Sequence, residues 1–281
     1  MNANDEEVLP SFRLTVLGTR GSMPGEGKAY ARYGDSTSCY RLVAGQEEIY
    51  LDAGSGISGV KTSPNTNLTI LFTHMHLDHL IGLPFFSGLA ETGRKIAIYA
   101  RPREGLSPKE AVDRLVIPPF WPITIDGYPA ETKFHTLDSP TEKFSLGEVL
   151  IEGMEGTHPG GSTVFRLTHR GKTIVYATDF EHNDPANTDA LIKFSRRADL
   201  LLYDAQYTEA EYPRCKGYGH STPEMGLNIA AEAEAKKLLL VHHAPWRSDE
   251  ELDQLEKQIK QKTQAAQFEA AFAKIGDEII L

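Results

Sequence analysis

The chain has 281 residues and a formal net charge of −10, and 40% of its residues are hydrophobic, which is enough for a sizeable core. The acidic balance argues against a broad nucleic-acid-binding face, because neutralising phosphates requires clustered Lys and Arg. Two cysteines give no disulfide framework and suit a reducing cytosol, and no apolar run reaches the roughly 20 residues that span a bilayer, so we expect a cytoplasmic protein without a membrane partner.

Predicted strands dominate the first half of the chain. Residues 1–10 are acidic and polar and are expected to form a flexible tail. Apolar alternation and short apolar runs after this tail predict strands over Phe12–Leu17, Ser38–Val43, Glu48–Leu51, Leu68–Phe72 and Lys95–Ala100. The fourth of these is almost continuously apolar, which is typical of a strand buried on both faces.

Residues 101–142 interrupt this pattern. Closely spaced prolines, at Pro118, Pro119, Pro122 and Pro129, predict a loop-like segment. One helix is expected within it, over Pro108–Leu115. The composition suits either a lid or pocket wall beside a site, or a structural excursion between two strands.

The second half repeats the order of strands followed by helices. Strands are predicted over Val149–Met154, Ser162–Thr168, Lys172–Tyr176, Asp199–Tyr203 and Lys237–Val241. Two segments have the polar capping residues that start helices, and they predict a helix over Met225–Ala235 and a last helix from Ser248. Strands and then helices in both parts of the chain indicate two similar halves, with sheets inside and helices outside.

Four metal-ligating side chains are packed into the six positions that directly follow the strand Leu68–Phe72: His74, His76, Asp78 and His79. Imidazole nitrogen and carboxylate oxygen are the ligands that borderline-soft divalent ions accept. Two histidines spaced two apart on an extended segment point the same way and can grip one ion. A single ion seldom needs four ligands from so short a segment, so the motif predicts a two-metal site.

Other candidate ligands also follow predicted strands. His158 lies in a Gly/Pro-rich turn, Asp179 follows the strand Lys172–Tyr176, and His242 and His243 follow Lys237–Val241. Strand ends meet at one rim of a sheet, where binding sites are commonly built. Each residue alone would also suit an ordinary turn or cap, but their recurrence at strand ends indicates one shared site.

In order and type, this whole set resembles the ligands of the metallo-β-lactamase-fold hydrolases, over nearly the full chain. The resemblance implies an α/β fold, a four-layer αββα sandwich of two mixed β-sheets flanked by helices, forming one domain over residues 11–281. It also implies a ligand role for each member of the set. One ion would be held by His74, His76 and His158, the other by Asp78, His79 and His242, and both would be bridged by Asp179.

One ligand position has two candidates. His242 is preferred because the family's ligand directly follows the apolar strand, and His243 is the alternative. Asp52 matches a strand-end aspartate of the family and is expected to orient ligands rather than to bind metal. The ions are expected to be two Zn²⁺, with Mn²⁺ or Fe compatible with the same ligands.

Two further residues resemble one branch of that superfamily. His220, in Tyr218–Thr222, resembles the His-Ser-Thr motif of ribonuclease Z and related phosphodiesterases, and Asp204 stands where that group has Glu. The chain has Asp179 where the true β-lactamases of this fold place Cys, which argues against antibiotic hydrolysis. It also lacks a basic arm for tRNA, so a small phosphodiester such as a cyclic nucleotide is the expected substrate, and RNA is disfavoured.

We therefore hypothesise a phosphodiesterase in which a hydroxide bridging two metal ions attacks phosphorus. In this hypothesis Asp78 accepts the proton of the attacking water, and His220, held by Asp204, protonates the leaving oxygen. The alternatives are a ribonuclease Z-like tRNA 3′-processing endonuclease, a lactone or thioester hydrolase using the same metals, and a non-catalytic metal- or nucleic-acid-binding module. The sequence leaves a homodimer open.

Overall fold

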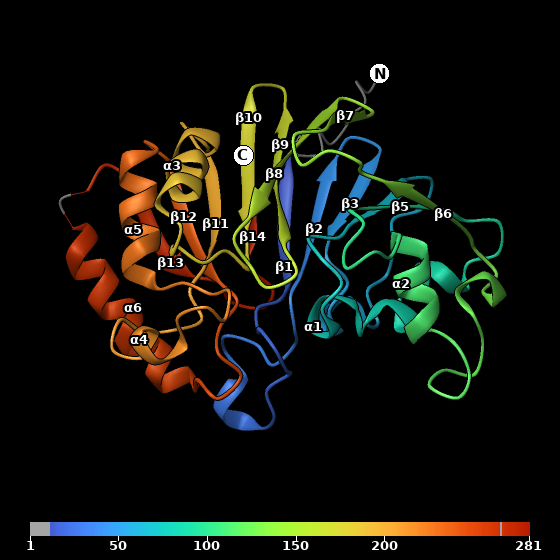
Figure 1. Ribbon diagram of the computed structural model, residues 1–281, viewed down its shortest axis with the longest axis horizontal. Coiled ribbons are helices and arrows are strands. Elements are labelled where there is room, and N and C mark those ends of the chain that lie inside the picture. The colour runs from blue at the N-terminus through green and yellow to red at the C-terminus, as the bar shows by residue number, and fades with distance from the viewer. Residues whose placement is uncertain (1–11, 265) are drawn as a thin grey trace, which may run out of the picture.

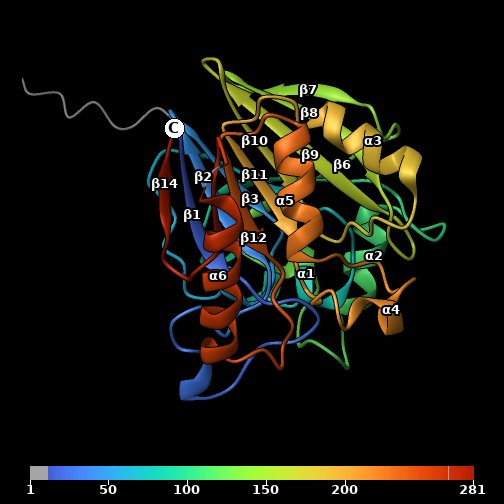
Figure 2. The ribbon, with the colours of Figure 1, turned by 90° about the vertical axis from the view of Figure 1, so that its left-hand side faces the viewer.

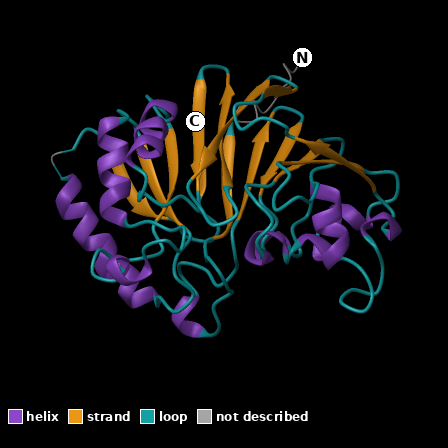
Figure 3. Cartoon of the chain, viewed as in Figure 1, coloured by secondary structure: helices purple, strands orange, loops and turns teal. Residues whose placement is uncertain are grey.

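The computed structural model describes residues 12–264 and 266–281, so the tail expected over residues 1–10 lies outside the described residues. Two seven-stranded β-sheets pack face to face, and helices lie on their outer faces (Figure 1, Figure 3). This arrangement confirms the predicted αββα sandwich.

The first sheet has the strand order β14-β1-β2-β3-β4-β5-β6. Its strands are β1 (Arg13–Gly18), β2 (Cys39–Ala44), β3 (Glu47–Leu51), β4 (Asn67–Leu71), β5 (Lys95–Ala100), β6 (Glu131–Thr136) and β14 (Glu278–Ile280). The strands from β14 to β3 pair antiparallel, whereas those from β3 to β6 pair parallel. Because parallel strands end at the same edge, β3, β4 and β5 deliver the residues that follow them to one rim.

The second sheet has the order β13-β12-β11-β10-β9-β8-β7. Its strands are β7 (Lys143–Leu146), β8 (Val149–Gly156), β9 (Ser162–His169), β10 (Lys172–Ala177), β11 (Leu200–Asp204), β12 (Lys237–Val241) and β13 (Glu269–Phe272). Strands β7 to β10 pair antiparallel and β10 to β13 pair parallel. The ends of β10, β11 and β12 therefore also share one rim.

Helices flank the sheets: the longer ones cover the outer faces, and the shortest ones lie near the lower ends of the strands in Figure 1. They are α1 (Leu77–Leu80), α2 (Pro108–Leu115), α3 (Pro185–Phe194), α4 (Tyr212–Cys215), α5 (Pro223–Glu232) and α6 (Asp249–Thr263). Figure 2 shows α3, α5 and α6 along the second sheet. The predicted helix starts are confirmed: the Thr222 hydroxyl accepts a bond from the Met225 amide at α5, and Ser248 forms a capping box with Glu251 at α6.

The main core lies between the sheets. Leu14 and Ile49 of the first sheet face Phe165 and Leu202 of the second, and all four are completely buried. Two further cores pack the outer faces against the helices. The central strands are apolar on both faces for this reason, so they appear in the sequence as clear apolar runs.

The sequence patterns did not predict β6, β7, β13, β14, α3 or the one-turn helix α4. Four of these are short strands at or next to sheet edges, where one side is exposed and the apolar run is weak. Strand β6 alternates exposed and half-buried residues, so part of segment 101–142 is sheet rather than loop. The helix predicted there is confirmed with unchanged bounds as α2.

The packing between the sheets predicts a large cost for truncating Leu202. Leu202→Ala should lower the free energy of unfolding by about 2–5 kcal/mol, because a buried side chain is lost and a cavity remains. Leu150→Ala in β8 is the matched control, since Leu150 is 38% exposed, and it should cost about 1 kcal/mol or less. Urea denaturation of both variants measures the difference, and equal losses would contradict this account of the core.

Candidate metal centre

The predicted ligands gather where the two sheets meet. His74 and His76 follow β4, His158 lies between β8 and β9, Asp179 follows β10, and His242 follows β12. Both sets of strands end at the lower rim in Figure 1. The first sheet and the second sheet therefore each supply part of one cluster.

Three of these strand ends share an unusual backbone conformation. Asp52, Asp179 and His242 have φ angles of 60°, 52° and 61°, in the left-handed region that non-glycine residues rarely adopt. Such residues typically cost about 1–3 kcal/mol and persist where the surrounding structure holds them. At each position the chain turns sharply as the strand ends, and the side chain is left inside the rim.

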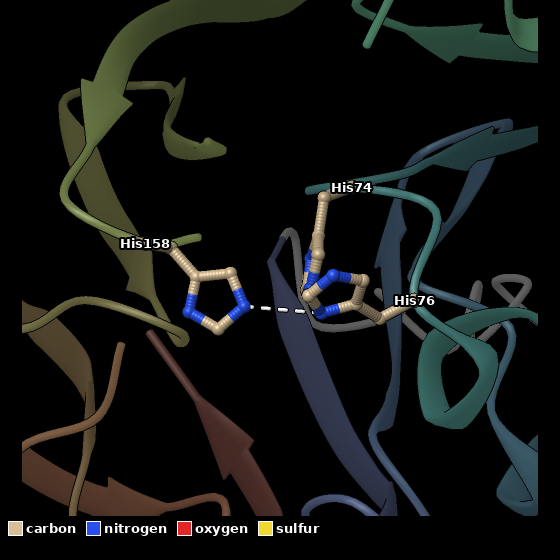
Figure 4. Close-up of side chains that lie close together, drawn as sticks. All are labelled: His74, His76 and His158. Carbon is tan, nitrogen blue, oxygen red and sulfur yellow. Dashed lines mark hydrogen bonds between the residues drawn. The ribbon is translucent and has the colours of Figure 1, made fainter. Parts of the chain in front are cut away.

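The first group of candidate ligands contains His74, His76 and His158 (Figure 4). His158 Nε2 lies 3.1 Å from His76 Nδ1, and the rings of His74 and His76 are 4.3 Å apart. A backbone hydrogen bond of 2.9 Å, from the Thr163 amide to the Thr73 carbonyl, joins the two sheets beside this group. The group is therefore held by sheet packing rather than by one loop.

The second group contains Asp78, His79 and His242. Asp78 and His79 lie in α1, and His242 approaches from the second sheet. Asp78 Oδ2 is 3.2 Å from His242 Nε2 and 3.4 Å from His79 Nε2. The Ser22 amide donates to the same oxygen at 2.7 Å and helps to fix its position.

Asp179 lies between the two groups. Its Oδ1 atom is 3.9 Å from His74 Nε2 and 3.7 Å from His158 Nε2. Its Oδ2 atom is 3.1 Å from His79 Nε2 and 3.2 Å from His242 Nε2. One carboxylate therefore faces both groups, with one oxygen toward each.

The spacing and bonding of these atoms suit divalent metal ions. Ligands about 2.0–2.1 Å from a tetrahedral ion lie about 3.3 Å apart, which is close to the separations seen within both groups. The Nε2 atoms of His74 and His79 are buried, and among the described residues neither has a hydrogen-bond partner. Buried polar atoms without partners are costly, and a bound cation would accept the lone pair of each of these nitrogens. The side chains thus form a His/Asp cluster of the metal-binding type.

The electrostatics favour the ligand form in the first group, whereas in the second group burial is outweighed by the Asp179 carboxylate and its acidic neighbours, which raise the pKa of His79 and of His242. Burial lowers the pKa of His74 and of His158 and so favours the neutral imidazole that binds metal. Burial alone would raise the pKa of Asp78, but the neighbouring His79 and His242 lower it well below its usual range. The cluster therefore presents neutral imidazoles in the first group and an ionised carboxylate in the second.

Asp52 supports His79 from outside the cluster. Its Oδ2 atom is 2.8 Å from His79 Nδ1, which directs the opposite nitrogen, Nε2, toward Asp78 and Asp179. The Tyr176 hydroxyl donates to the same Asp52 oxygen at 2.8 Å. These contacts agree with the orienting role expected for Asp52.

The structure separates the two adjacent histidines. His243 is buried, and its Nε2 atom is 2.8 Å from the Ala273 carbonyl, in a contact with the backbone after β13. His242 instead places Nε2 beside Asp78 and Asp179. The geometry favours His242 over His243 as the candidate ligand.

His220 and Asp204 form a pair next to the cluster. His220 Nδ1 is 3.0 Å from Asp204 Oδ2, and the His220 ring centroid is 4.8 Å from that of His242 and 5.3 Å from that of His158. Asp204 is completely buried, and it also accepts bonds from the backbone amides of Ser221 and Asp179. Asp204 therefore orients His220 and cannot reach a substrate itself.

Sequence reasoning missed Ser22, Tyr176 and Glu181, which all contact this site. Ser22 and Tyr176 bond the carboxylates described above. Glu181 is 1% exposed in the structure. Its only sequence signal was its position two residues after the candidate ligand Asp179. Ser22 gave no signal, because it bonds through its backbone amide.

The fold and the cluster together define a metal-dependent hydrolase of the metallo-β-lactamase fold. The chain belongs to the beta-lactamase superfamily, whose domain model matches residues 49–243. Within the described ranges of the chain, no helix is both long and apolar enough to cross a membrane.

Several known proteins resemble this chain over most of its length. Ribonuclease Z from Natronomonas pharaonis is 23% identical, with 83% of this chain and 87% of that protein covered. The short form of human tRNase Z has a TM-score of 0.67 at 21% identity, covering 96% and 98% of the two chains. A diphosphatase from the PhnP family has a TM-score of 0.68 at 18% identity, with the same coverage. The resemblance to the ribonuclease Z branch is thus confirmed.

Metal content should distinguish the two adjacent histidines. His242→Ala should lower the number of ions bound per protein, because it removes a nitrogen that faces Asp78 and Asp179. His243→Ala, the matched control, should keep the parent metal content, because the His243 ring lies against Phe272 and the Ala273 carbonyl rather than against Asp78 and Asp179. Elemental analysis of both folded variants after dialysis against Zn²⁺ gives the ratio. Metal loss in His243→Ala alone would reverse the assignment.

Proposed function

We propose that this hydrolase is a phosphodiesterase with two metal ions that cleaves a small phosphodiester, such as a cyclic nucleotide. The observation that carries the proposal is the His220–Asp204 pair, which lies against both groups of candidate ligands. The ions, for which Zn²⁺ is the first candidate, would be held by the seven side chains of the cluster: His74, His76, Asp78, His79, His158, Asp179 and His242.

The charge of the loaded site supports an anionic substrate. Two divalent ions outweigh the two carboxylates that face them, Asp78 and Asp179, so the centre is positive and attracts a phosphodiester. When bound, such ions lower the pKa of coordinated water toward about 7 and polarise the phosphoryl oxygens. Asp78, fixed by the Ser22 amide, is placed to accept a proton from the attacking water.

His220 is the proposed general acid. Asp204 occupies its Nδ1 atom, so the opposite nitrogen, Nε2, is the one that can hold a proton for the leaving oxygen. The Ser221 and Asp179 amides fix Asp204 in turn, which keeps the imidazole in one orientation. A thioester hydrolase has less need of such an acid, because a thiolate departs more easily than an alkoxide.

A pocket beside the metal centre supports a small ester group. It has a volume of about 250 Å³ and adjoins His74 and His76. Its apolar lining comprises Met75, Leu106, Ala111 and Pro159. Small-molecule sites usually measure about 300–1,000 Å³, so this pocket suits a compact group. We propose that segment 101–142, which supplies Leu106 and Ala111, is a pocket wall.

A ribonuclease Z-like activity on tRNA is the second candidate. The similarity to the ribonuclease Z of Natronomonas pharaonis favours it. The net charge of −10 does not favour it, and Arg103, which lines the pocket, shares the Glu155 carboxylate with Arg101. These three side chains therefore carry one net positive charge together, which suits a single phosphodiester better than a long RNA backbone.

The proposed acid predicts a kinetic defect without metal loss. His220→Ala should lower kcat for a cyclic nucleotide, whose alkoxide leaving group needs a proton, by about 10²–10⁴-fold, the usual contribution of general acid–base catalysis. Metal content should stay at the parent level, because His220 is outside the proposed ligand set. His135→Ala, at the half-exposed strand β6, is the control and should keep full activity. Retained metal with unchanged turnover would refute the role of His220.

The pocket predicts which substrates are turned over. Cyclic nucleotides should show a higher kcat/KM than precursor tRNA or lactones in a panel that includes all three. Ala111→Trp should fill the pocket and raise KM for cyclic nucleotides, with a smaller effect on methyl p-nitrophenyl phosphate, whereas Ala111→Ser should resemble the parent. Preferential cleavage of precursor tRNA would support the second candidate instead.

A further inference from the structure

Glu181 is a buried carboxylate that the proposed reaction does not use. It is 1% exposed and accepts three hydrogen bonds, from the Tyr212 hydroxyl at 3.0 Å, the Gly217 amide at 2.7 Å and the Gly219 amide at 2.9 Å. Three donors on one buried acid make it the anchor of the loop between α4 and His220. Its own amide donates to the Thr157 carbonyl at 2.8 Å.

These contacts join two parts of the metal centre. Thr157 directly precedes His158, and Gly219 directly precedes His220. Glu181 therefore bonds the turn that carries a candidate ligand through its backbone, and the loop that carries the proposed acid through its side chain. It touches neither imidazole, so any effect on them passes through the backbone.

The backbone of Gly219 links Glu181 to the His158 ring. Its carbonyl is 2.9 Å from His158 Nδ1 and suits a proton on that nitrogen, which leaves the lone pair of Nε2 to face His76 and Asp179. The approach is so close that a Cβ on Gly219 would lie 2.1 Å from His158 Nδ1, and its φ of +89° also favours glycine. The position of the Gly219 backbone thus sets the tautomer and the angle of the His158 ring.

We propose that Glu181 is a positioning residue that prepares His158 for metal by holding the Gly219 backbone in place. The proposal rests on the proposed function only through the ligand role of His158. Asp52 fixes the His79 ring directly, whereas Glu181 fixes the Gly219 backbone, whose carbonyl in turn fixes the His158 ring. Partners of this kind outside the ligand set typically change metal affinity or activity by about 10–100-fold.

The test is Zn²⁺ affinity, measured by competition with a chelating dye. Glu181→Gln keeps the shape of the side chain but replaces one acceptor oxygen with an NH2 group, which cannot accept a hydrogen bond from a backbone N–H. It should weaken Zn²⁺ binding by about 10–100-fold. If two ions bind, the loss should fall on one binding step, because Asp78, His79 and His242 are not touched by Glu181.

Two further variants keep the test decisive. Asp199→Asn is the matched control: Asp199 is also a buried carboxylate that accepts a backbone bond, from Thr173 at 2.9 Å, but it precedes β11 at the rim opposite Asp204. It should keep the parent Zn²⁺ affinity. Gly219→Ala leaves Glu181 intact but pushes His158 aside, so it should lose affinity as Glu181→Gln does.

Three outcomes would overturn the proposal: unchanged affinity in Glu181→Gln, an equal loss in Asp199→Asn, or unchanged affinity in Gly219→Ala. Thermal unfolding of each variant gives the folded fraction to which affinity is referred. The measurement needs no substrate. A failed phosphodiesterase assay therefore leaves it intact, and a failed affinity test leaves the proposed reaction standing.

Discussion

The Asp179 carboxylate is the point on which the site depends, because its two oxygens face two groups of histidines that come from different sheets. A buried carboxylate is stable only with opposite charges or hydrogen-bond donors close by. Two β-sheets must therefore meet with their strand ends within a few ångströms of each other. The apolar core between the sheets, with residues such as Phe165 and Leu202, supplies the packing that holds this alignment.

Around Asp179, strained backbone at the strand ends and hydrogen bonds from residues outside the candidate ligand set also hold the cluster in position. The left-handed conformations of Asp52, Asp179 and His242 are unfavourable alone, yet each occurs where a strand must stop and leave its side chain inside the rim. Asp52, Asp204 and Glu181 then fix the neighbouring imidazoles, directly or through the backbone. The chemistry is thus carried by few groups, and most of the buried polar residues nearby hold those groups still.

Sequence reasoning could predict the central strands and the candidate cluster, since both depend on local patterns. Buried parallel strands such as β12 are apolar throughout, and the motif from His74 to His79 concentrates ligands in one segment. Edge strands such as β6 carry no comparable pattern, because only neighbours distant in sequence specify them. The preference for His242 over His243 came from the family resemblance, whereas the side-chain contacts that separate the two rings involve partners distant in sequence, and the contacts of Glu181 span 31–38 residues. Neither set of contacts can be derived from composition or spacing.

The division of the candidate ligands between the two sheets would link metal supply to the integrity of the fold. The first sheet carries His74, His76, Asp78 and His79, while the second carries His158, Asp179 and His242. Ions bound between them would act as cross-links from sheet to sheet, and a ligand that binds only the folded form raises its stability in proportion to the logarithm of its free concentration. Neither half of the chain could hold the site alone. Loss of metal would then lower the stability of the packing between the two sheets as well as abolish the proposed activity.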